Sequence, residues 1–311
     1  MASATLKIAD PFLTTQNYAS YTHEQQSVWA ELVGRRMPHI NQWACDEYRE
    51  GYDLIGLSAE RIPDLYSIAR RLEPRTGWAT TPVTGFMPAD AFFEMLAARR
   101  FPTTTWLRDR TSLDYTPEPD IFHDVFGHVP MHAHRVFGDF LQHYGEVCAR
   151  VQDKTVLEKL GRLFWYTVEF GLICQKGKIK IYGSGVISSH GECENVVSGR
   201  CEVRKFDLEE VLTTPVKVDE IHKRLFAIES FDQIYEAMHH AETRLMPQGP
   251  KAKADCPQCN GSGFVLARVF LGPTNQVPTP CPQCQPELNP VAQTPAKPKT
   301  HSHSHRRENR K

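Results

Sequence analysis

The 311-residue sequence lacks any long apolar segment. Its first twenty residues contain no apolar run long enough for a signal peptide, and no later stretch approaches the roughly 20 residues that cross a bilayer. An excess of charge is also missing, because 36 Lys and Arg balance 37 Asp and Glu. No global field therefore attracts nucleic acid or an anionic membrane. These absences predict a cytosolic protein whose partners are small molecules.

Paired cysteine spacing is absent from most of the chain. Nine cysteines are present, and five are scattered through the main body: Cys45, Cys148, Cys174, Cys193 and Cys201. In a reducing compartment we expect these five to be buried free thiols. The other four belong to a separate pattern near the C-terminal end.

Apolar spacing predicts a mainly helical body with small β hairpins. Residues 22–25, Thr-His-Glu-Gln, have the form of a capping box, and apolar residues follow on one helical face at 28, 29, 32 and 33. Helical spacing recurs over 65–72, 92–96, 136–148 and about 230–244. Alternation is limited to short pieces at 179–181 and 225–228, which predict small sheets.

Composition divides the chain near Met246. We expect an N-terminal extension over 1–21 and a main domain over 22–245. Pro and Gly then interrupt any periodicity in a linker over 246–255. A cysteine module over 256–285 follows, and the Pro-, Lys- and His-rich residues 286–311 have too few apolar side chains to fold.

Two histidines and a carboxylate form a candidate metal site. His123 and His128 lie in PEPDIFHDVFGHVP. Residues five apart on an ideal helix point about 140° apart, so convergence on one ion requires the helix to bend or end near Gly127. Glu169 lies among apolar residues in LFWYTVEFGLI, where an isolated carboxylate is costly. It is protonated, paired with a cation such as an arginine, or bound to metal, and two imidazoles with one carboxylate suit iron(II).

Three segments carry a family resemblance. PEPDIFHDVFGHVP, FWYTVEFGL and IYGSGVISSHGE, in this order, closely resemble the pterin-dependent aromatic amino acid hydroxylases over roughly residues 20–240. The HDVFGH form resembles the bacterial branch that acts on phenylalanine. The resemblance implies the catalytic fold of this family, with His123, His128 and Glu169 as iron ligands. It implies hydroxylation of phenylalanine to tyrosine by O2 and a tetrahydropterin, such as tetrahydrobiopterin.

The resemblance also assigns residues to the substrate. Arg108 matches the guanidinium that binds the substrate carboxylate, for which a planar fork suits a bidentate pair. Thr116 and Ser188 match residues that complete the amino-acid site, and Trp165 and Pro119 match the walls around the ring. Without the resemblance, Arg108 would be interpreted as a solvated surface charge. The other four positions would be interpreted as residues that form turns or pack in the core.

Other matches point to the pterin. Phe92 resembles the aromatic residue that stacks on the cofactor, and it would otherwise read as core. Val83, Gly85 and Phe86 lie in VTGFMPA, which matches the loop that hydrogen-bonds the pterin through its backbone. Glu192 resembles an acidic residue on the pterin side, and its alternative is an exposed charge at a helix start.

The cysteine module carries two CPQC sequences. Cys256 and Cys259 precede a strand-like stretch at 264–270, and Cys281 and Cys284 follow it. Two such knuckles predict a structural zinc ribbon, with disulfides or free thiols as alternatives. CPQCNGSG also resembles the cysteine-rich repeats of certain chaperones, from which we infer metal binding and no chaperone activity.

Several alternatives stay open. Animal members of the family carry a regulatory domain and a tetramerisation helix; we expect neither here, and we expect a monomer. Tryptophan is an alternative substrate, but tryptophan hydroxylases tend to carry phenylalanine where Trp165 stands. Tyrosine hydroxylases carry aspartate where Val218 aligns. From another class, the chain could be a zinc-ribbon interaction protein whose hydroxylase body is inactive.

Overall fold

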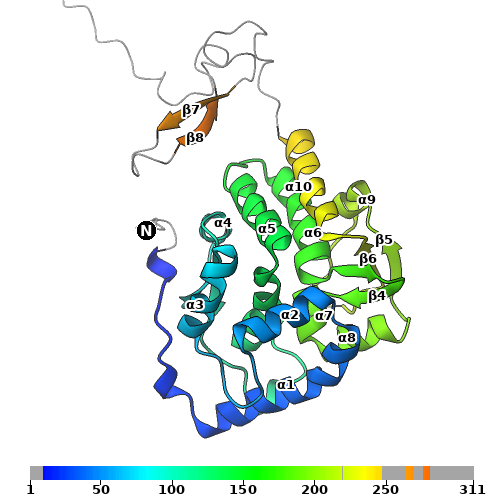
Figure 1. Cartoon of the computed structure of the whole chain (residues 1–311). Coiled ribbons are helices and arrows are strands. Elements are labelled where there is room, and N and C mark those ends of the chain that lie inside the picture. Colours follow the sequence, from blue (N-terminus) through cyan, green and yellow to red (C-terminus); the bar gives the residue numbers. More distant parts are fainter. Residues whose placement is uncertain (1–9, 219, 247–263, 269–275, 281–311) are drawn as a thin grey trace, which may run out of the picture. The chain divides into compact units, whose positions relative to one another are not determined.

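The computed structural model describes residues 10–218, 220–246, 264–268 and 276–280. By its internal contacts the chain divides into two units, Met1–Met246 and Pro247–Lys311. The first unit is mainly helical, and its small sheets lie beside the helices (Figure 1). Within the described residues, no helix is both long and apolar enough to cross a membrane.

Ten α-helices are described in the first unit. They are α1 (His23–Trp43), α2 (Asp46–Ile55), α3 (Leu65–Thr76), α4 (Ala89–Ala97), α5 (Arg135–Cys148), α6 (Lys154–Phe164), α7 (Ser184–Ser188), α8 (His190–Val197), α9 (Leu208–Thr213) and α10 (Phe231–Leu245). Short 3-10 turns are η1 (Asp10–Phe12), η2 (Tyr18–Ser20), η3 (Arg110–Ser112) and η5 (Val129–Ala133). Two segments, η4 (Phe122–His128) and η6 (Trp165–Glu169), are π-helices.

The predicted helices are present. The Gln25 N–H donates to Thr22 Oγ1 at 3.2 Å, and the Thr22 N–H donates to Gln25 Oε1 at 2.9 Å, so the capping box is confirmed. The helical spacing at 65–72, 92–96, 136–148 and 230–244 corresponds to α3, α4, α5 and α10. The apolar faces of α3, α5 and α10 enter one large core. Leu96 of α4 joins that core, whereas Ala91 and Met95 of α4 pack in a smaller cluster with Val83 and Met87.

The strands form two small sheets in the first unit. β1 (Ala79–Val83) pairs in parallel with β2 (Arg100–Thr104). The second sheet has the order β4-β3-β6-β5, made of β3 (Leu172–Gln175), β4 (Lys178–Ile181), β5 (Glu202–Lys205) and β6 (Arg224–Ile228). β3 and β4 form an antiparallel hairpin, whereas β6 runs parallel to both β3 and β5. The alternating pieces at 179–181 and 225–228 are therefore strands, as predicted.

The prediction for the scattered cysteines was wrong at one position. Cys45, Cys148, Cys193 and Cys201 are buried and free, but Cys174 is exposed. β3 pairs with β6 only at Leu172 and Ile173, so Cys174 lies beyond that pairing, toward the turn into β4. The spacing of cysteines along the sequence does not reveal which end of a short strand is covered.

In the second unit, β7 (Phe264–Arg268) pairs antiparallel with β8 (Gln276–Pro280), with Phe264 opposite Pro280. The strand-like stretch expected at 264–270 is thus a strand in its described part. The predicted zinc ligands Cys256, Cys259, Cys281 and Cys284 lie outside the described residues, as do most of the linker and all of the tail.

Candidate metal centre and active site

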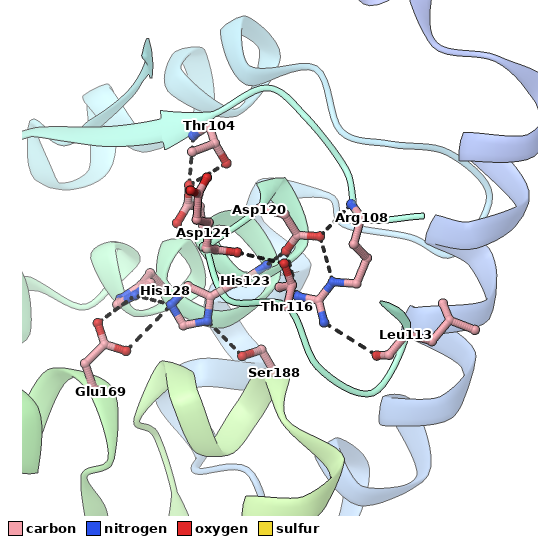
Figure 2. Close-up of polar contacts among 11 residues, drawn as sticks. Thr104, Arg108, Leu113, Thr116, Asp120, His123, Asp124, His128, Glu169 and Ser188 are labelled. Carbon is pink, nitrogen blue, oxygen red and sulfur yellow. Dashed lines mark hydrogen bonds and ion pairs between the residues drawn. The ribbon is translucent and has the colours of Figure 1, made fainter. Parts of the chain in front are cut away.

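The three predicted metal ligands come together in space. Nε2 of His128 lies 3.2 Å from Nε2 of His123 and 3.3 Å from Oε1 of Glu169. Nε2 of His123 lies 3.6 Å from Oε2 of Glu169. Figure 2 shows both imidazoles turned toward the carboxylate. One atom from each residue could therefore bind a single ion.

The histidines converge by a route that the sequence did not predict. The π-helix η4 ends at His128, one residue beyond Gly127, so the helix ends near Gly127 as expected, but its π-helical form was not expected. In a π-helix the backbone hydrogen bonds join residues five apart, so such residues lie on nearly the same face. Glu169 ends the second π-helix, η6. Two rare π segments thus supply all three ligand side chains.

Two serines hold the ligands in place. Ser188 Oγ lies 2.9 Å from Nδ1 of His123, which leaves Nε2 for a metal. The Ser184 hydroxyl donates to Oε2 of Glu169 at 2.7 Å. Ser184 comes this close because Gly183 packs on the backbone: a Cβ at Gly183 would lie 2.6 Å from the Glu169 carbonyl oxygen. Such outer partners fix the orientation of metal ligands.

The charge states of these groups suit a divalent cation. Burial lowers the pKa of His123 to about 4, although Glu169 opposes the shift. Burial raises the pKa of Glu169, but His128, His123 and Ser184 together outweigh it and hold the pKa at about 2. At neutral pH, His123 is therefore a neutral imidazole that can offer a lone pair to a metal, and it lies beside an ionised carboxylate. The alternative of a Glu169–arginine ion pair is not found among the described residues.

Arg108 is buried in an ion pair with Asp120. The Arg108 Nε donates to Asp120 Oδ2 at 2.8 Å, and Nη2 donates to Oδ1 at 2.7 Å. Oδ2 also accepts the Arg108 backbone N–H, and Oδ1 accepts the backbone N–H of His123. Burial raises the pKa of Asp120, but the hydrogen bonds and charge of Arg108 leave it lowered. Asp120 thus connects the arginine to the start of the metal-binding helix (Figure 2).

A second buried carboxylate, Asp124, belongs to this helix. Asp124 Oδ2 accepts both the N–H and the hydroxyl of Thr104, each at 2.8 Å. Burial raises the pKa of Asp124 to about 6. Sequence reasoning noted Asp124 only as a mark of the bacterial branch and assigned it no role.

A family model decides the classification. The model for biopterin-dependent aromatic amino acid hydroxylases matches residues 7–248. The chain belongs to this family. Two curated relatives named phenylalanine-4-hydroxylase, from Chromobacterium violaceum and Mesorhizobium japonicum, are each 40% identical. The matches cover 74% of this chain in both cases, and 77% and 84% of those proteins.

Solved structures agree with the family. The phenylalanine hydroxylase of Chromobacterium violaceum with bound iron(III) and 7,8-dihydrobiopterin matches with a TM-score of 0.72 at 40% identity, over 75% of this chain and 86% of that chain. The iron- and phenylalanine-bound form of that enzyme matches with a TM-score of 0.70 at 37% identity, over 77% of this chain and 89% of that chain. The predicted hydroxylase fold is therefore confirmed.

In this hydroxylase Trp165 is held by two residues from distant segments. The indole N–H of Trp165 donates to Nε2 of His222 at 2.8 Å. Nδ1 of His222 must then carry the proton, and it lies 2.8 Å from Oε1 of Glu192. Glu192 is buried, and its Oε2 has no hydrogen-bond partner. Glu192, which was expected on the pterin side, thus contacts the histidine that holds Trp165, and it is not an exposed charge.

The remaining predicted substrate residues lie on a loop. Thr116 and Pro119 belong to the segment between η3 and η4, and the Thr116 hydroxyl donates to the Glu118 carbonyl at 3.1 Å. Pro119 is exposed. Val218, which aligns with an aspartate of the tyrosine hydroxylases, is also exposed.

The predicted pterin residues surround the start of α4. Val83 is buried at the end of β1, and Phe86 is 90% exposed. Gly85 has a φ of 145°, which side chains rarely adopt. Phe92 is partly buried and contacts the rings of Phe93 and Phe164.

Proposed function

We propose that the chain is a phenylalanine 4-monooxygenase, which converts L-phenylalanine to L-tyrosine with O2 and a tetrahydropterin. His123, His128 and Glu169 hold one iron(II). The observation that carries this proposal is the convergence of two imidazoles and one carboxylate at the same positions that match the family motifs. The six bacterial relatives named phenylalanine-4-hydroxylase, at 36% to 41% identity, support the choice of substrate.

The chain's own residues prepare the site for its cofactors. Bound iron and tetrahydropterin supply dioxygen activation and the two electrons that the substrate cannot. A set of three protein ligands leaves coordination positions open. Ser188 keeps Nδ1 of His123 occupied, and Ser184 holds one oxygen of Glu169, so neither ligand needs to reorient when iron binds.

Arg108 binds the substrate carboxylate in this proposal. Its Nε and Nη2 are engaged by Asp120, whereas Nη1 has only a long contact of 3.5 Å with the Leu113 carbonyl. Nη1 and the second N–H of Nη2 are the donors left for a ligand. Asp120 therefore positions the guanidinium. Thr116 and Ser188 complete the amino-acid site.

Trp165 and Pro119 form the walls around the aromatic ring. The Glu192–His222 pair holds the Trp165 indole by its N–H, so the ring has one orientation. A fixed indole leaves less room for a two-ring substrate, which supports phenylalanine over tryptophan. The contact of Glu192 with His222 favours a role behind Trp165 over the expected contact with pterin.

The pterin binds against Phe92 and the loop that contains Val83, Gly85 and Phe86. The exposed Phe86 and the uncovered backbone at Gly85 support this assignment. A cofactor that forms hydrogen bonds with the backbone of this loop can approach it only where no side chain covers that backbone. A Cβ added at Gly85 would lie within 4 Å of no atom of the described residues outside its chain neighbours.

One assay tests the proposed function. The iron(II)-loaded protein is incubated with a tetrahydropterin, O2 and an equal mixture of phenylalanine, tyrosine and tryptophan, and the products are separated by chromatography. We expect tyrosine from phenylalanine as the main product, with slow hydroxylation of tryptophan. Faster consumption of tryptophan would reject phenylalanine as the preferred substrate. The absence of any pterin-dependent product would instead support the alternative of an inactive hydroxylase body.

We also propose a structural zinc ion bound by Cys256, Cys259, Cys281 and Cys284. The support is the spacing of the two CPQC sequences and the paired strands β7 and β8 that lie between them in the sequence. Replacing Cys256 and Cys259 together with serine should remove one zinc per chain and leave the iron content unchanged. An unchanged zinc content would contradict the assignment.

A further inference from the structure

A second group of two histidines and a glutamate lies between α5 and α10. His143 comes from α5, and His239 and Glu242 come from α10. The ligand atoms of the three residues all lie within 4.8 Å of one another. The two helices pack against each other and run side by side in Figure 1. Neither the family motifs nor the proposed reaction uses these residues.

The distance between an imidazole nitrogen and a carboxylate oxygen in this cluster is similar to that in the iron site. Nε2 of His143 lies 3.0 Å from Oε2 of Glu242, yet this buried nitrogen makes no hydrogen bond with Glu242 or with any other described residue. The rings of His143 and His239 lie 4.2 Å apart at an angle of 30°. A buried imidazole nitrogen without a hydrogen bond is unfavourable. An ion between the nitrogen and the carboxylate would satisfy both.

The spacing along each helix supports the same arrangement. His239 and Glu242 are three residues apart, as are His143 and Glu146, and residues at this spacing share one helix face. The face of α10 therefore offers an imidazole and a carboxylate together.

The outer partners of the cluster also fit a metal site. Oε1 of Glu242 accepts from Nη2 of Arg150 at 2.6 Å, which directs Oε2 toward His143. On the far side of the His143 ring, Nδ1 lies 3.8 Å from Oε2 of Glu146. Metal-binding histidines commonly direct their second nitrogen at a carboxylate in this way.

A third cluster provides a contrast. His39, His190 and Glu194 also place ligand atoms within 4.8 Å of one another. There, however, Nε2 of His39 makes a 2.6 Å hydrogen bond with Oε1 of Glu194. The closest contact of that cluster is explained without an ion, so we draw no metal site from it.

We propose that His143, His239 and Glu242 form a second metal site, for zinc or a similar divalent transition metal, that joins α10 to α5. Two imidazoles and one carboxylate are a ligand set that zinc accepts, with water in the remaining position. The site is open to solvent through the exposed His239. A metal that bridges α5 and α10 stabilises the catalytic unit, and it takes no part in the proposed reaction.

Zinc binding to the full chain tests this site. The iron-loaded protein is dialysed against micromolar zinc, and zinc and iron per chain are measured together. The variants are His239→Ala and Glu242→Gln, with His240→Ala as the matched control, since His240 is an exposed neighbour on the same helix outside the cluster. All variants keep the iron site and the tail cysteines, so zinc bound elsewhere cancels in the comparison.

We expect the wild type and His240→Ala to bind one zinc more per chain than either cluster variant, at unchanged iron content. Zinc should also raise the melting temperature of the wild type and His240→Ala by several degrees more than that of His239→Ala. Equal zinc content in all four proteins would overturn the proposal. A zinc difference without a difference in melting temperature would overturn the role of the metal in joining the helices.

Discussion

Replacing Asp120 with asparagine should destabilise the catalytic unit more than almost any other conservative change. Each oxygen of Asp120 accepts two N–H groups: Oδ2 from the backbone and Nε of Arg108, and Oδ1 from Nη2 of Arg108 and the backbone of His123. An asparagine NH2 group must replace one of these oxygens. In either orientation it meets two donors and can accept from neither.

The magnitude follows from these contacts. Asp120 is fully buried and Arg108 is 7% exposed, so the variant leaves a buried guanidinium without its counter-charge. Breaking such a pair costs about 3–5 kcal/mol. For a unit of this size, each kcal/mol lowers the melting temperature by roughly 2–4 °C, which gives a decrease of roughly 6–20 °C. The Michaelis constant for phenylalanine should rise as well, because Arg108 loses its orientation.

Asp114→Asn is the matched control for this prediction. Asp114 lies on the same loop and pairs with Arg35, but its side chain is 86% exposed. An exposed pair contributes about 0–1 kcal/mol, so this variant should melt within a few degrees of the wild type. Calorimetry of the three proteins decides the matter. If Asp120→Asn melts at the temperature of Asp114→Asn, the buried pair does not hold the site together.

Three further predictions concern the active site and the tail. Trp165→Phe removes the donor to His222 and leaves more room for a two-ring substrate. Competition kinetics should show a higher ratio of catalytic efficiency for tryptophan to that for phenylalanine, a change in discrimination of about 1–3 kcal/mol at most. An unchanged ratio would reject Trp165 as a wall of the substrate site. Ser184→Ala frees one oxygen of Glu169 and should weaken iron binding by roughly 10–100-fold in a chelator competition; equal affinity would show that the hydroxyl does not orient the ligand. A chain that ends near Gly249 should keep its hydroxylase activity, and loss of turnover would place the tail in the active site.

The candidate iron ligands could be predicted because their chemistry depends on single residues and short motifs. A carboxylate among apolar side chains needs a partner, and Glu169 has His123 and His128. Their geometry was not predictable, since apolar spacing distinguishes a helix from a strand but does not reveal a π-helical turn. The expectation of a bend or an end near Gly127 assumed an ideal α-helix. η4 does end at His128, but its π-helical hydrogen bonds already place residues five apart on nearly the same face.

Residues that act through tertiary contacts escaped prediction for another reason. Asp120 and Arg108 lie 12 positions apart, and nothing in the sequence between them indicates their ion pair. His222 lies 57 positions from Trp165 in the sequence, two residues before β6, and the residues around it give no sign of their contact. The exposed Cys174 shows the same limit. Burial at one position depends on which neighbouring strand reaches it, and a single sequence does not contain that pairing.

An iron titration tests the central claim most directly. Metal-free protein is given increasing iron(II) with saturating tetrahydropterin, O2 and phenylalanine, and the rate of tyrosine formation is plotted against iron per chain. We predict a linear rise that stops at one iron per chain in the wild type, and no rise in His128→Ala. Tyrosine formation that needs no iron, or a full rise in His128→Ala, would contradict the claim that His123, His128 and Glu169 hold the catalytic iron.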